Sequence, residues 1–324
     1  MSSKPTLPSI HDIRKAHETI KDTVHQTPIL SCRALSRLAK GDLYFKCENF
    51  QLGGAFKIRG AYNRLAQLNE EEMKRGVVAY SSGNHAQGVA LAAQILGIQA
   101  TIFMPVDAPK VKLAGVKGYG AEAIMVGTTS AQRREAALEF SEETGAVVIP
   151  PFDDFHIIAG QGTVGLEMAL QVPDVTRVVV PIGGGGLISG ISIAVKALKP
   201  EVEIIGVEPE LAAKMANSLA HGEITETIPG DTLGDGLKPV KPGKLTFAAV
   251  QKNVDRVVTV GEREIAAATK LIMERAKIVV EPSGAVTLAA CLFKKIDCSK
   301  GKTVLVFSGG NVDLEDFVRK TGSF

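Results

Sequence analysis

The chain has 324 residues, 45% of them apolar, and its 37 basic and 35 acidic residues leave a net charge of +2. This balance argues against nucleic acid or a membrane surface as a partner, and no apolar run is long enough to span a bilayer. Four scattered cysteines without a C-x-x-C pair argue against a disulfide framework or a zinc site, and they predict a cytoplasmic protein.

Along the chain, strands alternate with helices. The pattern predicts strands at residues 43–47, 77–80, 101–104, 122–126, 147–149, 178–180, 203–208, 256–260 and 303–307. It predicts helices at 9–23, from about 57 to 68, and at 86–96, 110–116, 131–143, 161–170, 188–198, 262–276 and 283–293, with a less regular segment at 220–247.

This alternation is typical of right-handed βαβ crossovers, so the sequence predicts an α/β fold with two open, mostly parallel sheets flanked by helices. The strands and helices between about Gly53 and Ala146 form a self-contained set. We therefore expect a small, mobile domain (residues 53–147) inserted into a large domain (residues 1–52 and 148–324), with the functional site in the cleft between them.

Four turns rich in glycine or serine follow predicted strands, where ligands bind in open α/β sheets. The turns lie around Lys57, at residues 81–85, at 183–186 and at 308–311. The four consecutive glycines of the third turn lead from a β-branched strand into a helix, which is typical of a phosphate cradle. No Lys-Ser or Lys-Thr follows them and no G-x-G-x-x-G frame fits, so nucleotide P-loop and dinucleotide sites are excluded, while an ordinary flexible turn stays open.

A reactive lysine would complete this chemistry. Lys57 is either a solvated surface lysine or, because Phe56 and Ile58 flank it, an amine with a lowered pKa that is suited to a Schiff base. Ser308 ends an apolar strand and is either a helix N-cap or a partner for a ring nitrogen. A phosphate cradle, a reactive lysine and such a partner together indicate pyridoxal 5'-phosphate.

Five motifs carry a family resemblance, at residues 54–61, 81–87, 159–163, 183–187 and 308–313. The chain resembles the fold-type II pyridoxal-phosphate enzymes, whose architecture is that of the tryptophan synthase β chain, and within them the threonine/serine dehydratase and serine racemase family. The resemblance implies that Lys57 holds the cofactor as a Schiff base, that Phe56 packs on its ring, that Asn84 binds its hydroxyl and that Ser308 faces its ring nitrogen. It assigns the phosphate to Gly183, Gly184, Gly185, Gly186 and Leu187, and the substrate carboxylate to Ser81, Ser82, Gly83, Asn84 and His85.

The activity that this resemblance implies is an ammonia-lyase, or dehydratase, acting on a small amino acid. It would eliminate water from L-threonine, L-serine or a related 3-hydroxy amino acid and give a 2-oxo acid and ammonia. Lys57 would remove the Cα proton, and Ser82 stands where racemases keep an acid/base for the opposite face. A serine racemase with dehydratase side activity, a 3-hydroxyaspartate dehydratase, a β-replacement synthase and a cofactor-binding protein without turnover stay open. The family also implies a homodimer.

Charged residues at two places in the chain bear on a metal and on the substrate. Relatives that bind a divalent cation use a glutamate and an aspartate six residues later; here Glu208 is followed at that distance by Lys214, so we expect no metal. Lys214 either pairs with Glu208 or points to solvent. Arg133 and Arg134 are either partners for a substrate side-chain carboxylate or, the interpretation that we favour, part of a solvated helix face.

Overall fold

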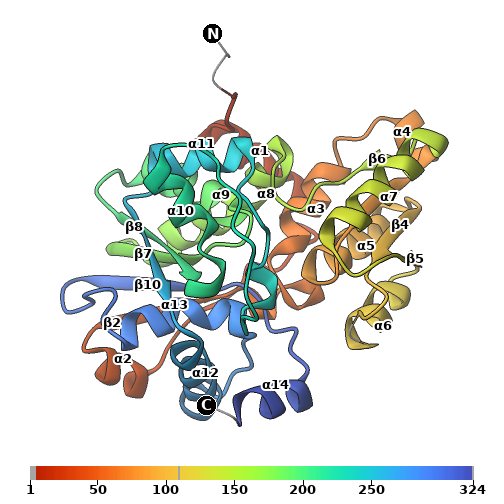
Figure 1. The fold of residues 1–324 in the computed structure, drawn as a ribbon. Helices are drawn as coiled ribbons and strands as arrows, with labels where there is room; N and C mark the ends of the chain where they lie inside the picture. Colours follow the sequence, from red (N-terminus) through yellow and green to blue (C-terminus); the bar gives the residue numbers. More distant parts are fainter. Residues whose placement is uncertain (1–4, 109, 323–324) are drawn as a thin grey trace.

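The computed structural model describes residues 5–108 and 110–322, which form two units, each built around one sheet (Figure 1). The larger sheet has the strand order β1-β2-β10-β7-β8-β9; β1 and β2 pair antiparallel and the other neighbours pair parallel. Its strands are β1 (Ile29–Ser31), β2 (Asp42–Cys47), β10 (Lys302–Phe307), β7 (Val175–Pro181), β8 (Glu203–Pro209) and β9 (Arg256–Val260).

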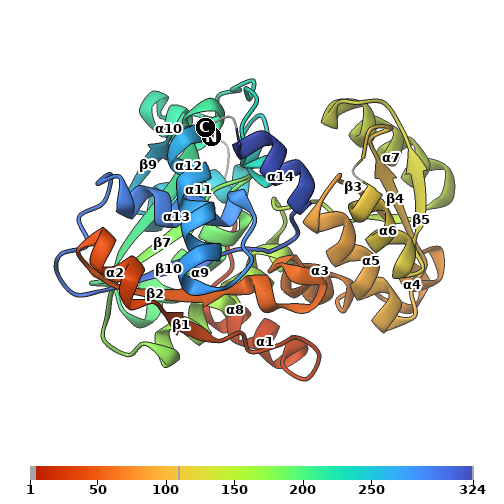
Figure 2. The same cartoon turned by 90° about the horizontal axis from the view of Figure 1, so that it is seen from below.

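The smaller sheet is parallel throughout and has the order β5-β4-β3-β6. Its strands are β3 (Val77–Tyr80), β4 (Ala100–Met104), β5 (Glu122–Met125) and β6 (Val147–Val148). In both views this sheet and its helices form a separate lobe on the right (Figures 1 and 2). The predicted α/β fold with two open, mostly parallel sheets is therefore confirmed.

Helices cover both sheets. The helices that pack on the smaller sheet or join it to the larger one are α3 (Lys57–Leu65), α4 (Glu70–Arg75), α5 (Asn84–Leu96), α6 (Lys110–Gly118) and α7 (Ser130–Thr144). Those of the larger unit are α1 (Ile10–Ile20), α2 (Arg33–Ala39), α8 (Phe155–Gln171), α9 (Gly186–Leu198), α10 (Lys214–His221), α11 (Lys244–Asn253), α12 (Glu262–Leu271), α13 (Pro282–Leu292) and α14 (Leu314–Thr321). Within the described ranges, no helix is both long and apolar enough to cross a membrane.

The central strand β7 is buried on both faces because its side chains alternate. Val179 packs into the cluster that contains α13, whereas Val178 and Val180 pack into the cluster that contains α9. On that second side α8 crosses α9 closely: a Cβ at Gly190 would lie 2.4 Å from the backbone nitrogen of Gly162. Glycine at this crossing fixes the position of α9, whose first residues belong to the glycine-rich turn.

Several elements differ from the sequence prediction. The predicted start of a helix at residue 161 is wrong, because α8 begins at Phe155, where the Asp154 side chain accepts hydrogen bonds from the N–H groups of His156 and Ile157. The helices α2, α4, α10, α11 and α14 were not predicted. All of these are short, with ten residues or fewer, and few apolar positions mark the helical period in them.

The interpretation as a solvated helix face holds for the exposed Arg134 but is wrong for Arg133. Its side chain is buried, and its guanidinium donates to the Thr128 carbonyl and to Ser130 Oγ at the start of its own helix. The residue boundaries of the two domains stay a prediction, since α3 packs against both α5 of the smaller unit and α8 of the larger one.

Candidate active site

Lys57 is the first residue of α3, and its amine lies among groups from distant parts of the chain. Nζ donates a hydrogen bond of 2.7 Å to the Pro151 carbonyl and lies 5.2 Å from the centre of the Phe56 ring. Burial lowers the pKa of Lys57 to about 8, although the charge of Glu281 opposes this shift. Near neutral pH a useful fraction of the amine is therefore uncharged, the form that acts as a nucleophile or a base.

The turn at Ser308 lies directly beside Lys57. The Phe56 N–H donates to the Ser308 carbonyl at 3.1 Å, and Ala55 forms an isolated β-bridge with Gly309. Ser308 itself is buried at the end of β10, and the side chain that caps the following helix α14 is Asp313. The N-cap interpretation of Ser308 is thus wrong, and its hydroxyl is left for another role.

The turn at residues 81–85 joins β3 to α5, so its backbone N–H groups lie at a helix N-terminus. Gly83 N–H donates to Ser81 Oγ, while Ser82 is only partly buried. His85 is buried; its Nε2 donates to the Ile149 carbonyl at 3.0 Å, and burial together with the charge of Lys57 lowers its pKa to about 3. His85 is therefore neutral and holds the turn to the segment after β6.

Asn84 connects this turn to two others. Its Nδ2 donates to Glu281 Oε1 at 2.7 Å, and its Oδ1 accepts from Asn311 Nδ2 at 3.0 Å. The Asn311 amide also donates to the Gly53 carbonyl at 2.7 Å. The orientation of the Asn84 amide is fixed by these contacts, and one of its two N–H groups stays available for a ligand.

The four glycines Gly183 to Gly186 lead from β7 into α9. Gly185 has φ +98°, a backbone conformation that side chains with a Cβ rarely adopt, and a Cβ at Gly184 would lie 2.1 Å from the Phe152 ring. Thr246 Oγ1 donates to the Gly184 carbonyl at 2.8 Å. The N–H groups at the start of α9, from Gly186 and Leu187, have no partner within the helix, an arrangement that suits an anion.

These turns meet, as the sequence predicted. Phe152 packs on the segment Gly183 to Gly186, called the glycine loop below. The preceding residue, Pro151, accepts the hydrogen bond from Lys57. A partly buried amine, free N–H groups at a helix N-terminus, a fixed amide and a buried hydroxyl fit the aldehyde, phosphate, ring hydroxyl and ring nitrogen of pyridoxal phosphate, respectively. The role of each single residue toward the cofactor, including ring packing by Phe56 and ring-nitrogen contact by Ser308, stays a prediction.

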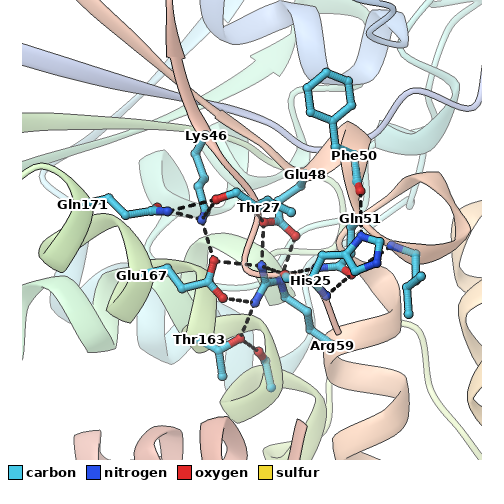
Figure 3. A network of polar contacts seen from close by, with 12 residues as sticks. His25, Thr27, Lys46, Glu48, Phe50, Gln51, Arg59, Thr163, Glu167 and Gln171 are labelled. Atoms are coloured by element: carbon cyan, nitrogen blue, oxygen red, sulfur yellow. Dashed lines mark hydrogen bonds and ion pairs between the residues drawn. The ribbon is translucent and has the colours of Figure 1, made fainter. Parts of the chain in front are cut away.

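A buried charge network holds the helix that carries Lys57 (Figure 3). Arg59 lies between two carboxylates, with its Nε 2.7 Å from Glu48 Oε2 and its Nη1 2.6 Å from Glu167 Oε1. Lys46 contacts the other oxygen of Glu167, and all four side chains are at most 4% exposed. The two positive and two negative charges balance, so α3 is fixed to β2 and α8 without a buried net charge.

Lys214 pairs with Glu208 and does not point to solvent. Its Nζ lies 2.8 Å from Glu208 Oε1, and both side chains are buried. The ammonium stands where a cation between Glu208 and the nearby carbonyl groups would have to lie, so these residues do not fit a divalent metal. Elsewhere in the described part of the chain, no group of three or more His, Cys, Asp or Glu side chains could hold one.

Sequence reasoning missed two charged residues at this site. Glu281 stands at the end of an apolar run, just before Pro282, and burial raises its pKa to about 7. Lys112 of α6 reaches across from the smaller unit and pairs with Asp235 Oδ2 at 2.7 Å. A single acid before a proline, or one lysine in a helix, has no spacing that would reveal such a role; the acid within an apolar run was the available signal.

A family model, curated relatives and solved structures all identify the same enzyme family. Residues 20–309 match the family described as pyridoxal-phosphate dependent enzyme. The chain is 51% identical to an L-threonine ammonia-lyase of Thermotoga maritima over 94% of this chain and 76% of that protein. It is 41% identical to a serine racemase of Schizosaccharomyces pombe over 98% of both chains. The solved structure of maize serine racemase superposes with a TM-score of 0.93 at 42% identity and 98% coverage of both chains.

Proposed function

Because the chain belongs to the pyridoxal-phosphate dependent enzyme family, we propose that it is an ammonia-lyase that eliminates water from L-threonine, L-serine or a related 3-hydroxy amino acid. The observation that carries the proposal is the position of Lys57, a partly buried amine with a pKa of about 8 that donates to the Pro151 carbonyl, next to the Phe152 ring that packs on the glycine loop. The similarity to L-threonine ammonia-lyase over nearly the whole chain supports this reaction among those of the family.

Each group of the site has a defined task in this proposal. The cofactor, when bound, supplies an electron sink for the negative charge that develops at Cα. Gly183 to Leu187 hold its phosphate, and the backbone N–H groups of residues 81–85 hold the substrate carboxylate. Asn84 and Ser308 orient the ring through its hydroxyl and its nitrogen.

Lys57 then acts as the base that removes the Cα proton. The Cβ–O bond breaks, the hydroxyl leaves with a proton as water, and an enamine remains. Hydrolysis of the enamine takes up one water and releases ammonia and the 2-oxo acid, so the atoms balance. His85 is neutral and bonded to a carbonyl, which supports Lys57 rather than His85 as the base.

A serine racemase is the second candidate, and the similarity to the racemase of Schizosaccharomyces pombe supports it. In that case Ser82 would donate a proton to the opposite face of Cα. Its place in the turn that is proposed to hold the substrate carboxylate is consistent with this role.

One assay separates these candidates. The purified holoenzyme is incubated with L-threonine, L-serine, D-serine and L-threo-3-hydroxyaspartate, and both the 2-oxo acid and the chirality of the remaining serine are measured. Fast 2-oxo acid release that Lys57→Ala abolishes supports the lyase. Inverted serine with little 2-oxo acid, lost in Ser82→Ala, would transfer the assignment to the racemase, and cofactor binding without either product would contradict both.

We further propose that the enzyme is a homodimer in the cytoplasm. The four cysteines are free thiols, three of them buried, which suits a reducing compartment. Light scattering coupled to gel filtration tests the dimer, and a mass of one chain would contradict it.

A further inference from the structure

The ammonium of Lys214 lies in a cage of oxygen atoms. Within hydrogen-bond distance of Nζ are Glu208 Oε1 at 2.8 Å and the carbonyl oxygens of Ile182, Leu237 and Ala212 at 2.9, 3.0 and 3.2 Å. The Lys214 side chain is 1% exposed. All four neighbours are acceptors, so the charged form with its three N–H donors is the form that this cage satisfies.

Two of the carbonyls belong to segments that adjoin the glycine loop. Ile182 directly precedes Gly183, and Leu237 ends the short 3-10 helix η4 (Asp235–Leu237). These segments also touch each other, since a Cβ at Gly183 would lie 2.9 Å from the Gly236 carbonyl oxygen. Lys214 therefore connects the start of the glycine loop to the segment that packs against it.

Glu208 keeps its place by separate contacts. Its two carboxylate oxygens accept the N–H groups of Met215 and Ala216, at 3.0 and 2.9 Å, at the N-terminus of α10. Without the ammonium, this buried carboxylate would face three carbonyl oxygens with no opposing charge. Such an arrangement is costly, and a cation is what relieves it.

The oxygen atoms of the cage are of the kind that bind a metal cation, but they are spaced for an ammonium group. Its oxygens lie 2.8–3.2 Å from Nζ, whereas they would have to approach within about 2.0–2.6 Å of Mg²⁺ or Ca²⁺. A divalent ion can therefore enter only if the lysine is removed.

We propose that Lys214 is a built-in cation: a positioning residue that holds the glycine loop against η4 and makes retention of the cofactor independent of divalent ions. The proposal rests on the proposed phosphate-binding role of Gly183 to Leu187. It predicts that a carboxylate at position 214 would convert the cage into a metal-dependent site, because every ligand would then be an oxygen.

The experiment compares the wild-type holoenzyme with Lys214→Met, Lys214→Asp and a matched control, Lys270→Asp, which changes a lysine that is 72% exposed. Each protein is kept in EDTA or in millimolar Mg²⁺ or Mn²⁺. The rate of cofactor dissociation is followed by visible absorbance, and the thermal midpoint is measured for both holoenzyme and apoprotein.

In the wild type and in Lys270→Asp, neither quantity should respond to EDTA or to the metals. Lys214→Met should lose the cofactor about 10- to 100-fold faster, as for other residues that orient ligand groups, and no metal should reverse this. Lys214→Asp should show the same loss in EDTA and recover with Mg²⁺ or Mn²⁺, a response that a purely structural lysine would not give.

A saturable rise of the wild-type thermal midpoint with either metal would overturn the proposal. So would unchanged cofactor dissociation in Lys214→Met, or a folded Lys214→Asp that ignores both metals. If neither variant folds, calorimetric titration of the wild-type holoenzyme with Mn²⁺ decides, since saturable binding contradicts the built-in cation and no binding supports it. A chain that never takes up the cofactor would defeat the proposed function, while the metal response of the Lys214→Asp apoprotein would still report on Lys214.

Discussion

Asn84 Nδ2 donates a 2.7 Å hydrogen bond to Glu281 Oε1, and this contact joins the first residue of α5 to the residue just before α13. A Cβ on Gly309 would lie 2.5 Å from the same oxygen, so the Ser308 turn closes over the pair. Glu281 is thus in contact with a proposed cofactor ligand and electrostatically coupled to Lys57. Its protonation should affect the stability of the apoprotein and the behaviour of Lys57.

Glu281→Gln should change how apoprotein stability depends on pH. Burial raises the pKa of Glu281 from its ordinary value of 4.5 to about 7, so the folded state binds this proton more tightly than the unfolded state does. The stability that Glu281 contributes is therefore fully present below pH 4.5 and is lost as the pH rises to about 7. The thermal midpoint of Glu281→Gln minus that of the wild type should grow between pH 5 and pH 7.5; a difference that stays constant would contradict the raised pKa.

Cofactor attachment to the apoprotein should follow the titration of Lys57. Burial lowers its pKa to about 8, and the neutral amine is the attacking form, so the attachment rate should rise with pH up to about 8 and then level off. Stopped-flow absorbance measures this rate, with Nα-acetyl-lysine as the control for titration of the cofactor itself. In Glu281→Gln the midpoint should move to lower pH, because the negative charge that raises the pKa of Lys57 is gone; a wild-type midpoint near 10 would contradict the prediction.

Gly184→Ala should disturb the glycine loop. Its Cβ would meet the Phe152 ring at 2.1 Å, and overpacking of this kind costs about 1–3 kcal/mol of stability. We expect a lower thermal midpoint and faster loss of cofactor. Gly118→Ala is the matched control, because a Cβ there meets nothing within 4 Å at the end of helix α6. Equal midpoints for the two variants would show that the loop can move away from Phe152.

Arg59→Met should be strongly destabilising. It leaves Glu167 paired with Lys46 alone and leaves Glu48 with a hydrogen bond from Thr27 but no ion-pair partner, and removal of one member of a buried ion pair costs about 3–5 kcal/mol. Urea unfolding of the apoprotein measures this loss. Lys74→Met breaks an ion pair with Glu71 in which both side chains are about 70% exposed, and it should leave the unfolding midpoint unchanged. A small effect of Arg59→Met would mean that the two carboxylates take up protons and stay in place.

Lys112→Met and Asp235→Asn should raise the KM of the amino acid by similar factors. Their ion pair joins α6 to η4, but the Asp235 side chain is 57% exposed, so the coupling is expected to be about 0.2–1 kcal/mol. The double variant should therefore be no worse than either single one, and added salt should weaken the effect in the wild type. Additive changes in KM would contradict a direct role of the pair.

The sequence predicted the candidate site best at positions where both the residue type and its place after a strand indicate one function. Lys57 and the four glycines were predictable because an apolar-flanked lysine and a glycine run after a buried strand each have a specific use. The state of Lys214 was not predictable, because its partners are carbonyl oxygens of residues far apart in the chain, which any sequence supplies. Glu281 was missed, and Arg59 was assigned no role of its own, for the same reason: their roles depend on burial and on partners such as Asn84 and Glu167.

Among the secondary-structure elements, the strongly apolar strands β7 and β10 were predicted within a few residues, whereas α8 began six residues early. Asp154 carried the signal for that start, since its side chain caps the helix, but the aromatic and polar residues that follow hide the apolar period. Short surface helices such as α10 have too few buried positions to be recognised by periodicity.

The strand order of the larger sheet sets the sequence in which the chain can fold during synthesis. Strand β2 lies between β1 and β10. Residues 42–47 therefore cannot form their parallel pairing until residues 302–307 have been synthesised. The smaller sheet, in contrast, is complete once residue 148 has been made, and its strands are close together along the chain. The nascent chain is thus expected to form the smaller lobe early, while the sheet that presents the glycine loop closes only after residue 307 has been made, leaving β2 as an exposed edge that chaperones would have to protect.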